Sequence, residues 1–364
     1  MKISEIIQHL ESIAPLYLQE SYDNAGLITG QADWECKGAL ICLDATEEVV
    51  LEAIEKGCNL VIAHHPIIFS GLKKLNGKNY VERTVIKAIK NNIAIYAAHT
   101  NLDNVHNGVN AVICEKLGLI NCSILSPKKE ILRKLITFCP VKNASNVRQA
   151  LFAAGGGHIG NYDECSFNAE GFGTFRASES ASPVVGKKGK QHQEKELRIE
   201  IIFPAFIEKR LIATLLEVHP YEEVAYDIVL LENSHQRIGS GMIGELKKEE
   251  TEKSFLTRLK RTMKCEVVRH TKLTGKKIKR VAVCGGAGSF LIKDAIAAKA
   301  DIFITADMKY HEFFDADGKL VLADIGHFES EAFTRDLFYS VLTDKFPNFA
   351  VHLSKTNTNP INYI

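Results

Sequence analysis

A chain of 364 residues is long enough for two or three domains. Hydrophobic residues make up 46% of it and charged residues 24%, which is ordinary for a soluble globular protein. The formal net charge is +1, from 45 Lys and Arg against 44 Asp and Glu, so the composition gives no electrostatic footprint for nucleic acid or for an anionic membrane.

No apolar stretch approaches the roughly 20 residues that a membrane helix needs. The first ten residues form an amphipathic helix pattern without the apolar centre of a signal peptide. The nine cysteines include no Cys-x-x-Cys pair, and several, such as Cys42, Cys139 and Cys284, lie inside apolar runs. Scattered cysteines of this kind indicate reduced, buried thiols, so we expect a cytoplasmic protein that makes no membrane contact.

Residues 1–126 alternate predicted helices and strands. The helices are expected at 3–14, 46–56, 80–91 and 107–117, and the strands at 38–43, 59–63 and 93–98. This alternation predicts a sheet with crossover helices that cover both of its faces.

The pattern changes between residues 127 and 238, where one unit of strand, proline, helix, turn and strand occurs twice. The first copy has a strand at 134–138 and a helix at 144–154, and the second has a strand at 197–203, a helix at 205–217 and a strand at 224–231. Two such units predict a ferredoxin-like β-α-β-β-α-β domain. The Gly/Ser/Lys-rich stretch 169–195 between them is expected to be an extended hairpin or a mobile loop, with solvated lysines.

Strand–helix alternation returns in residues 239–364. Strands are expected at 280–284, 301–305 and 320–323, and helices at 290–299 and 328–343. The fold class is therefore α/β: two α/β halves, 1–126 and 239–364, flank an inserted α+β domain at 127–238. We expect the halves to pack as one domain, because candidate metal ligands in both must meet.

Those candidate ligands follow three of the predicted strands. His64 and His65 follow the first, His99 and Asp103 follow the second, and His327 and Glu331, four residues apart on the first turn of a helix, follow the third. Ligands in open α/β sheets bind beyond the carboxyl ends of the strands. Residues four apart share a helix face, and the chain past a strand end can turn two adjacent histidines toward one cavity.

Imidazole and carboxylate ligands fit Zn²⁺, Mn²⁺, Fe²⁺, Co²⁺ or Ni²⁺. No thiolate joins the set, which argues against a closed structural zinc site. Taken alone, the His64–His65 pair could equally be a surface or capping pair. His99 is either a further ligand or a proton carrier. The turn at Gly285-Gly286-Ala287-Gly288-Ser289 could cradle a phosphate at a helix N-terminus or could be a tight strand-to-helix turn.

These motifs together resemble the NIF-three-like family, the GTP cyclohydrolase 1 type 2 homologs, over essentially the whole chain. The residues after 127 resemble the PII/CutA-like domain of the family's longer bacterial members. The matching segments are Asp23-Asn24-x-Gly26-Leu27, Ala63-His64-His65-Pro66, His99-Thr100-Asn101-Leu102-Asp103, Gly285-Gly286-x-Gly288-Ser289, Thr305-Ala306-Asp307-x-Lys309-Tyr310-His311 and Gly326-His327-x-x-x-Glu331, with Gly157-His158-Ile159-Gly160-Asn161-Tyr162 and His219-Pro220-Tyr221-Glu222-Glu223 in the insert.

The resemblance implies a dinuclear centre with two divalent ions per chain. His65 and Asp103 would hold one ion, His64 and His327 the other, and Glu331 would bridge them. It also implies a toroidal homohexamer, a trimer of dimers.

The activity that the resemblance implies is hydrolytic opening of the guanine ring of GTP with release of formate. His99 would move protons, while Lys309 or the turn at Gly286 and Gly288 would bind phosphate. The alternatives are a phosphohydrolase acting on another nucleotide and a non-catalytic metal-binding regulator or scaffold. Processing of nucleic acid is disfavoured by the near-zero net charge.

Overall fold

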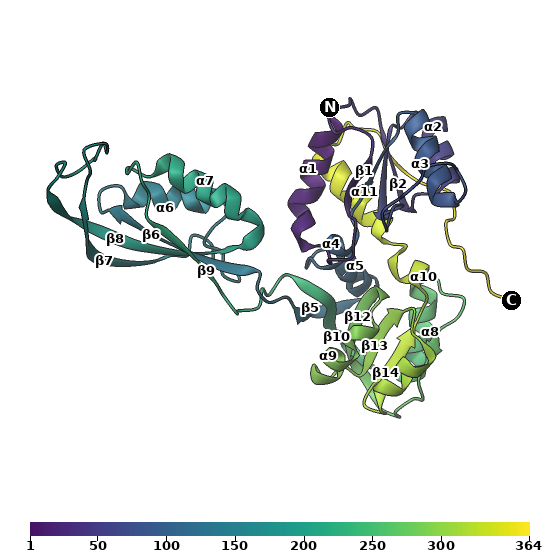
Figure 1. Cartoon of the computed structure of the whole chain (residues 1–364). Coiled ribbons are helices and arrows are strands. Elements are labelled where there is room, and N and C mark those ends of the chain that lie inside the picture. The colour runs from purple at the N-terminus through teal and green to yellow at the C-terminus, as the bar shows by residue number, and fades with distance from the viewer. The chain divides into compact units, whose positions relative to one another are not determined.

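The structure is a computed structural model that describes residues 1–364, and the chain divides into two compact units (Figure 1). One unit, here called the core unit, comprises Met1–Pro127 and Arg237–Ile364. The other, here called the insert, comprises Lys128–Gln236. The chain is a mixed α/β protein with three sheets, two in the core unit and one in the insert, as the alternating pattern predicts.

The first sheet of the core unit has the strand order β1-β4-β3-β2-β15. Four strands are parallel, namely β4 (Ala94–Ala97), β3 (Leu60–His65), β2 (Ala39–Asp44) and β15 (Val351–Leu353), and β1 (Gly26–Thr29) runs antiparallel to β4. Side chains of α2 (Glu47–Glu55) and α3 (Tyr80–Lys90) pack on one face. Figure 1 shows α1 (Ile3–Ile13) and α11 (Thr334–Lys345) on the opposite side.

The second sheet of the core unit has the order β11-β14-β13-β12-β10-β5. Its parallel centre is made of β12 (Lys277–Ala287), β13 (Ile302–Ala306) and β14 (Val321–Asp324). The antiparallel strands are β10 (Gly239–Thr251), β5 (Leu119–Pro127) and β11 (Arg269–His270). One face is covered by η3 (Ser289–Leu291), α9 (Ile292–Ala297) and η4 (Tyr310–Ala316). Helix α8 (Glu252–Thr262) contacts β10 and β12, and α5 (Val109–Lys116) contacts β12.

The two segments of the core unit exchange edge strands. Strand β5, from the segment before the insert, pairs with β10 in the second sheet, and β15, near the C-terminus, pairs with β2 in the first. Each sheet therefore needs both segments, which explains how residues so far apart in sequence are brought together.

The insert is a four-stranded antiparallel sheet with two helices on one face. The strand order is β7-β8-β6-β9, for β7 (Phe167–Arg176), β8 (Gln191–Pro204), β6 (Leu132–Pro140) and β9 (Tyr226–Leu230). Helices α6 (Ala144–Ala153) and α7 (Glu208–Val218) pack on alternate residues of β6 and β8, so the other face of this sheet carries no helix. The predicted loop 169–195 contains most of β7 and the first residues of β8, so it is a hairpin whose tip is 177–190.

None of the helices combines the length and the apolar character that a membrane span requires. All nine cysteines are free thiols. Cys36, Cys122 and Cys165 are partly accessible, and the other six are buried, as the apolar runs around several of them predict.

Candidate metal centre

The candidate ligands come together within the core unit from three elements. Strand β3 ends with His64 and His65, the short helix α4 (Thr100–Asp103) ends with Asp103, and α10 (His327–Glu331) begins and ends with the other two. Three sets of side chains place one ligand atom each within 4.8 Å of the others: His64, His65 and His99; His65, His327 and Glu331; and His64, Asp103 and Glu331.

Glu331 lies at the middle of this cluster and is only 2% exposed. Its Oε2 atom is 2.9 Å from Nε2 of His65, 3.0 Å from Nε2 of His327 and 3.7 Å from Nε2 of His64. The contact with His327 is the predicted approach of residues four apart on one helix face. The sequence pattern predicts His64 and His65 just beyond the strand, but they are the last two residues of β3. Both still reach Glu331.

His64 and Asp103 carry the clearest sign of a missing partner. Nε2 of His64 lies 3.7 Å from Oδ1 of Asp103, and both atoms are fully buried without a hydrogen-bond partner. Buried polar atoms are nearly always hydrogen-bonded, because leaving them unpaired costs free energy. An imidazole nitrogen and two carboxylates facing one point form a donor set that suits a divalent cation. The residues present therefore fit a bound metal.

A second sign is that every imidazole of the cluster is held at Nδ1 by an acceptor. Metal-binding histidines usually have such a partner, which fixes the ring and leaves Nε2 for the metal. The four pairs are His64 with the Ala98 carbonyl at 2.8 Å, His65 with Asp44 at 2.7 Å, His327 with Asp307 at 2.7 Å and His99 with Asp23 at 2.8 Å.

Three of these acceptors are carboxylates to which the sequence patterns assign no role in the site. Asp23 is typical of a turn residue, yet it also accepts hydrogen bonds from the backbone N–H and the hydroxyl of Thr100. Asp44 is paired in register with His65 across β2 and β3. Asp44 ends β2, the strand that precedes β3 in the chain. A carboxylate at that strand end is the sequence signal that points to Asp44. Asp307 lies in a family motif, which is the only sequence signal for it.

The electrostatics of the metal-free cluster are dominated by burial and by close opposite charges. Burial disfavours charged imidazoles, but the hydrogen bonds to carboxylates outweigh it and raise the pKa of His65 to about 9 and that of His327 to about 11. Burial and the neighbouring Glu331 raise the pKa of Asp103 to about 8. Burial acts against ionisation of Glu331 too, but the surrounding histidines hold its pKa well below the usual range. Metal ions would therefore displace protons here.

The glycine turn lies close against the cluster, because its glycines have no side chains to occupy the space. Gly286 has φ +62°, and a Cβ there would lie 2.4 Å from Oε1 of Glu331. Its N–H donates to the Ser330 hydroxyl at 2.9 Å. A Cβ on Gly288 would lie 2.5 Å from the Thr305 hydroxyl. These contacts support the tight-turn alternative, in which Gly286 makes room for Glu331.

Lys309 lies at the start of η4, exposed, and its backbone N–H donates to Glu312. No contact links its side chain to the cluster. His99 is closer: its ring centroid is 5.3 Å from that of His64 and 5.4 Å from that of His65. Both alternatives for His99, ligand and proton carrier, stay open.

Glu331 is common to two of the ligand sets. These sets join His65 with His327 and His64 with Asp103, which is a different pairing from the one that the resemblance implies.

Known proteins resemble this chain over essentially its whole length. The sequence profile of the family Duf34/NIF3 (NGG1p interacting factor 3) matches residues 1–360. The chain belongs to the Duf34/NIF3 family. A curated member from Bacillus subtilis (strain 168), named "GTP cyclohydrolase 1 type 2 homolog", is 38% identical over 99% of this chain and 98% of its own length.

Solved structures of NIF3 relatives have the same fold over the whole chain. The Bacillus cereus protein related to NIF3 superimposes with a TM-score of 0.87 at 38% identity, covering 100% of this chain and 99% of the other. Staphylococcus aureus protein SA1388 gives a TM-score of 0.79 at 31% identity, with the same coverage. The resemblance found in the sequence is thereby confirmed at the level of the family and of the overall fold.

Proposed function

We propose that this NIF3-family protein is a metal-dependent hydrolase whose centre holds two divalent ions on His64, His65, Asp103, His327 and Glu331. The observation that carries the proposal is the pair of buried, unpartnered ligand atoms, Nε2 of His64 and Oδ1 of Asp103. Glu331 belongs to two sets of ligand atoms, so it is the residue that would be shared by both ions.

Bound divalent ions would lower the pKa of a coordinated water and stabilise negative charge that develops on a substrate. The chain's own contribution is to hold each Nε2 toward the centre and to move protons. His99 is our candidate for proton transfer, because Asp23 holds its Nδ1 and its ring faces His64 and His65. Asp23 also has a pKa lowered to about 2, with burial opposing and the bonds from His99 and Thr100 favouring the charged form, so it stays a carboxylate.

GTP is the substrate that we propose to test first, because the curated relatives carry the name GTP cyclohydrolase 1 type 2 homolog. In that reaction water adds at C8 of the guanine ring and the ring opens to a formamide, which a second water hydrolyses to release C8 as formate. The exposed Lys309 and the turn at Gly288 are candidates for binding the phosphates. Gly286 is a weaker candidate since its N–H is already engaged by Ser330.

Metal content tests the centre. Elemental analysis of reconstituted protein should give two ions per chain, and Glu331→Gln should lose both. The matched control is Glu48→Gln, at an exposed glutamate in the first turn of α2. One ion per wild-type chain would refute the dinuclear arrangement, and none would refute the metal centre itself.

Product analysis tests the reaction. Metal-loaded protein incubated with GTP should release formate, and the signal should vanish with a chelator and in Glu331→Gln. Release of phosphate without formate would assign the protein to the phosphohydrolases. If a broad panel of nucleotides gave neither product, the regulator or scaffold alternative would replace the hydrolase.

For the rest of the chain, we propose that 127–238 is a ferredoxin-like domain of the PII/CutA-like type between α/β halves at 1–126 and 239–364. The β-α-β-β-α-β connectivity and the order β7-β8-β6-β9 support this. We also propose a cytoplasmic, toroidal homohexamer built as a trimer of dimers. Light scattering of the purified protein tests the assembly, for which a hexameric mass is expected.

A further inference from the structure

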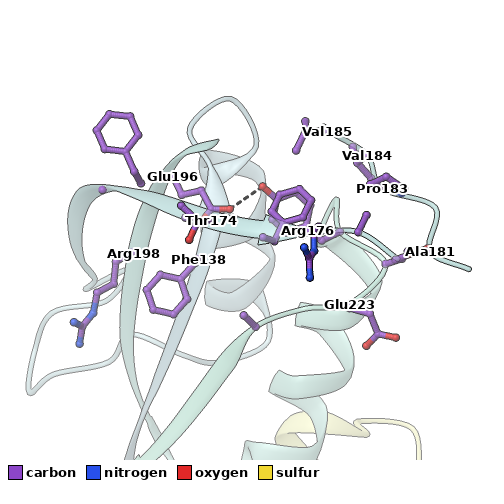
Figure 2. A pocket seen from close by; sticks show the side chains of 18 of the residues that line it. Phe138, Thr174, Arg176, Ala181, Pro183, Val184, Val185, Glu196, Arg198 and Glu223 are labelled. Carbon is purple, nitrogen blue, oxygen red and sulfur yellow. Dashed lines mark hydrogen bonds between the residues drawn. The ribbon is translucent and has the colours of Figure 1, made fainter. Parts of the chain in front are cut away.

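The insert has a cavity of its own, on the sheet face that carries no helix. Its volume is about 790 Å³, within the roughly 300–1,000 Å³ typical of small-molecule sites. The floor is made by side chains of β6, β7 and β8, and Figure 2 shows Phe138 and Arg198 on one side with Pro183, Val184 and Val185 on the other. The metal centre lies in the core unit, so this cavity belongs to a different part of the protein.

A single buried carboxylate lines this cavity. Glu196 is 8% exposed, and its one hydrogen bond comes from the hydroxyl of Tyr221, which donates to Oε1 at 2.7 Å (Figure 2). Burial and this hydrogen bond raise the pKa of Tyr221, so the phenol remains a donor. No lysine or arginine is paired with Glu196. Its neighbour Arg198 is bonded to Glu200 at 2.8 Å instead. Burying a carboxylate without a cation costs free energy unless further hydrogen bonds or an opposite charge compensate it.

The sequence around Glu196 keeps space beside it. Gly171 is directly opposite in the β7–β8 ladder, and Gly173 is the diagonal neighbour. A Cβ on Gly173 would lie 2.2 Å from Oε2 of Glu196, whereas a Cβ on Gly171 would meet nothing within 4 Å. Glycine weakens a strand interior and often marks a place where something approaches closely. Gly173 admits the carboxylate, and Gly171 leaves open space next to it.

The walls of the cavity favour a flat, cationic or N–H-rich ligand. Four aromatic residues line it, namely Phe138, Phe172, Phe175 and Tyr221, and the rings of the last two have centroids 6.4 Å apart. The charged lining consists of four glutamates and two arginines, so the balance is acidic. The apolar stretch Pro183–Val185 closes one side, and the Ser182 N–H donates to Glu222 at 2.7 Å, which ties that stretch to the turn after α7.

We propose that this cavity binds a small molecule in which a flat ring presents two adjacent N–H donors to the carboxylate of Glu196. Two kinds of molecule share this chemistry: an aromatic amidinium cation and the N1–H and N2–H₂ edge of guanine. Oε2 of Glu196 has no hydrogen-bond partner, and Oε1, which accepts from Tyr221, keeps a free lone pair. Each oxygen can therefore accept one N–H from the ligand. The aromatic rings stack on the flat body of the ligand.

The test uses the full-length protein and two matched pairs of probes. Isothermal titration and thermal shift are measured with benzamidine against benzamide, and with guanosine against adenosine. Binding of benzamidine but not benzamide identifies a cation site, and binding of guanosine but not adenosine identifies a guanine site. In either case Glu196→Gln should weaken the probe at least tenfold, since it keeps the size of the side chain and removes the charge.

Further variants separate binding from folding. Gly173→Ala should also weaken the probe, because the added Cβ displaces the carboxylate. Glu217→Gln, at an exposed glutamate of α7, is the control and should bind like the wild type. Glu196→Gln should unfold at the same or a higher temperature, because it removes a buried unpaired charge.

Chelator-treated protein should bind the probe as well as metal-loaded protein does, so a failed metal centre would leave this result intact. Binding of none of the four probes, or equal binding by Glu196→Gln, would overturn the proposal. A changed oligomeric mass in Glu196→Gln would assign the carboxylate to a contact between copies and would overturn it as well.

Discussion

At the scale of single residues, the candidate centre depends on acceptors that hold the imidazole rings and are not themselves candidate ligands. Each imidazole ring has its Nδ1 occupied, by Asp44 for His65 and by Asp307 for His327. The carboxylates fix the tautomer and the ring plane, which prepares Nε2 for binding. Asp44 is itself held by the hydroxyl of Thr358, at the C-terminal end of the chain.

Asp44→Asn should weaken metal binding about 10–100-fold while leaving the fold intact. The amide can present its nitrogen to His65, which would turn the ring or its tautomer away from the productive one. Metal affinity is measured by competition with a chromophoric chelator. Asp33→Asn, at an exposed aspartate outside every helix and strand, is the control and should keep wild-type affinity. Equal affinities for the two variants would show that Asp44 does not position His65.

The protonation of the cluster predicts an unusual pH dependence for the metal-free protein. The pKa of His65 is raised from 6.5 to about 9, and that of Asp103 from 3.8 to about 8. The folded state therefore holds protons that the unfolded chain has lost, so stability should fall as pH rises from 6.5 to 9. Metal-loaded protein should lack this loss, and its apparent metal affinity should rise over the same window, because the ions displace the protons.

Urea unfolding at several pH values, with and without chelator, measures this effect. Cys122 would change stability in the opposite direction as pH rises, because its hydrogen bond with Cys114 lowers its pKa to about 7 against the effect of burial. The comparison is therefore best made in a Cys122→Ser background. Metal-free stability that stayed level or rose between pH 6.5 and 9 would contradict the proposed protonation.

At the scale of elements, the turn after β12 shows how backbone shape makes the site possible. Gly286 adopts φ +62°, and its missing Cβ leaves the space that Oε1 of Glu331 fills. Gly57 is a matched comparison, with φ +68° and no atom within 4 Å of the place that a Cβ would take. The two glycines share the backbone requirement and differ in their surroundings.

Gly57→Ala should cost about 1–2 kcal/mol of unfolding free energy, from left-handed backbone strain alone. Gly286→Ala should cost more, by about 1–3 kcal/mol for the added collision, and should also reduce metal binding because Glu331 must move. Denaturant unfolding and metal titration of both variants test this. Normal metal content in Gly286→Ala would show that the turn serves another purpose.

The elements that sequence patterns predict are those with continuous apolar runs. Strands β2, β3 and β4 are buried on both faces, so their runs are visible in the sequence. Strand β7 is predicted only as part of a hairpin or a mobile loop, because it is mostly exposed and contains Gly171 and Gly173, the residues that open the insert's cavity. The strand-end rule accounts for the approach of the segments after β3 and β4, which share a sheet, but β14 lies in the second sheet, so the approach of His327 and Glu331 depends on how the two sheets of the core unit pack. The Nδ1 acceptors are not predicted by that rule, because Asp44 depends on the register between β2 and β3, and Asp23 and Asp307 lie outside the strands.

At the scale of the whole molecule, the insert joins the core unit through two adjacent strands. Strands β5 and β10 pair antiparallel, and Pro127 lies opposite Gly239 in their ladder. The chain therefore leaves and re-enters the core unit at neighbouring positions, as is usual where a domain has been inserted. Each unit also has a hydrophobic core of its own, that of the insert lying between its sheet and helices α6 and α7.

Replacing residues 128–236 by a short Gly-Ser linker should leave a folded core unit that binds the same number of metal ions as the whole chain. All five candidate ligands and their Nδ1 acceptors lie outside the deleted segment, and the linker has only to join two paired strand ends. Circular dichroism reports the fold and elemental analysis the metal. The same deletion should abolish binding of the benzamidine or guanosine probe. A soluble, folded deletion variant without metal would mean that the insert helps to build the centre, and the two sites would then have to be treated as one.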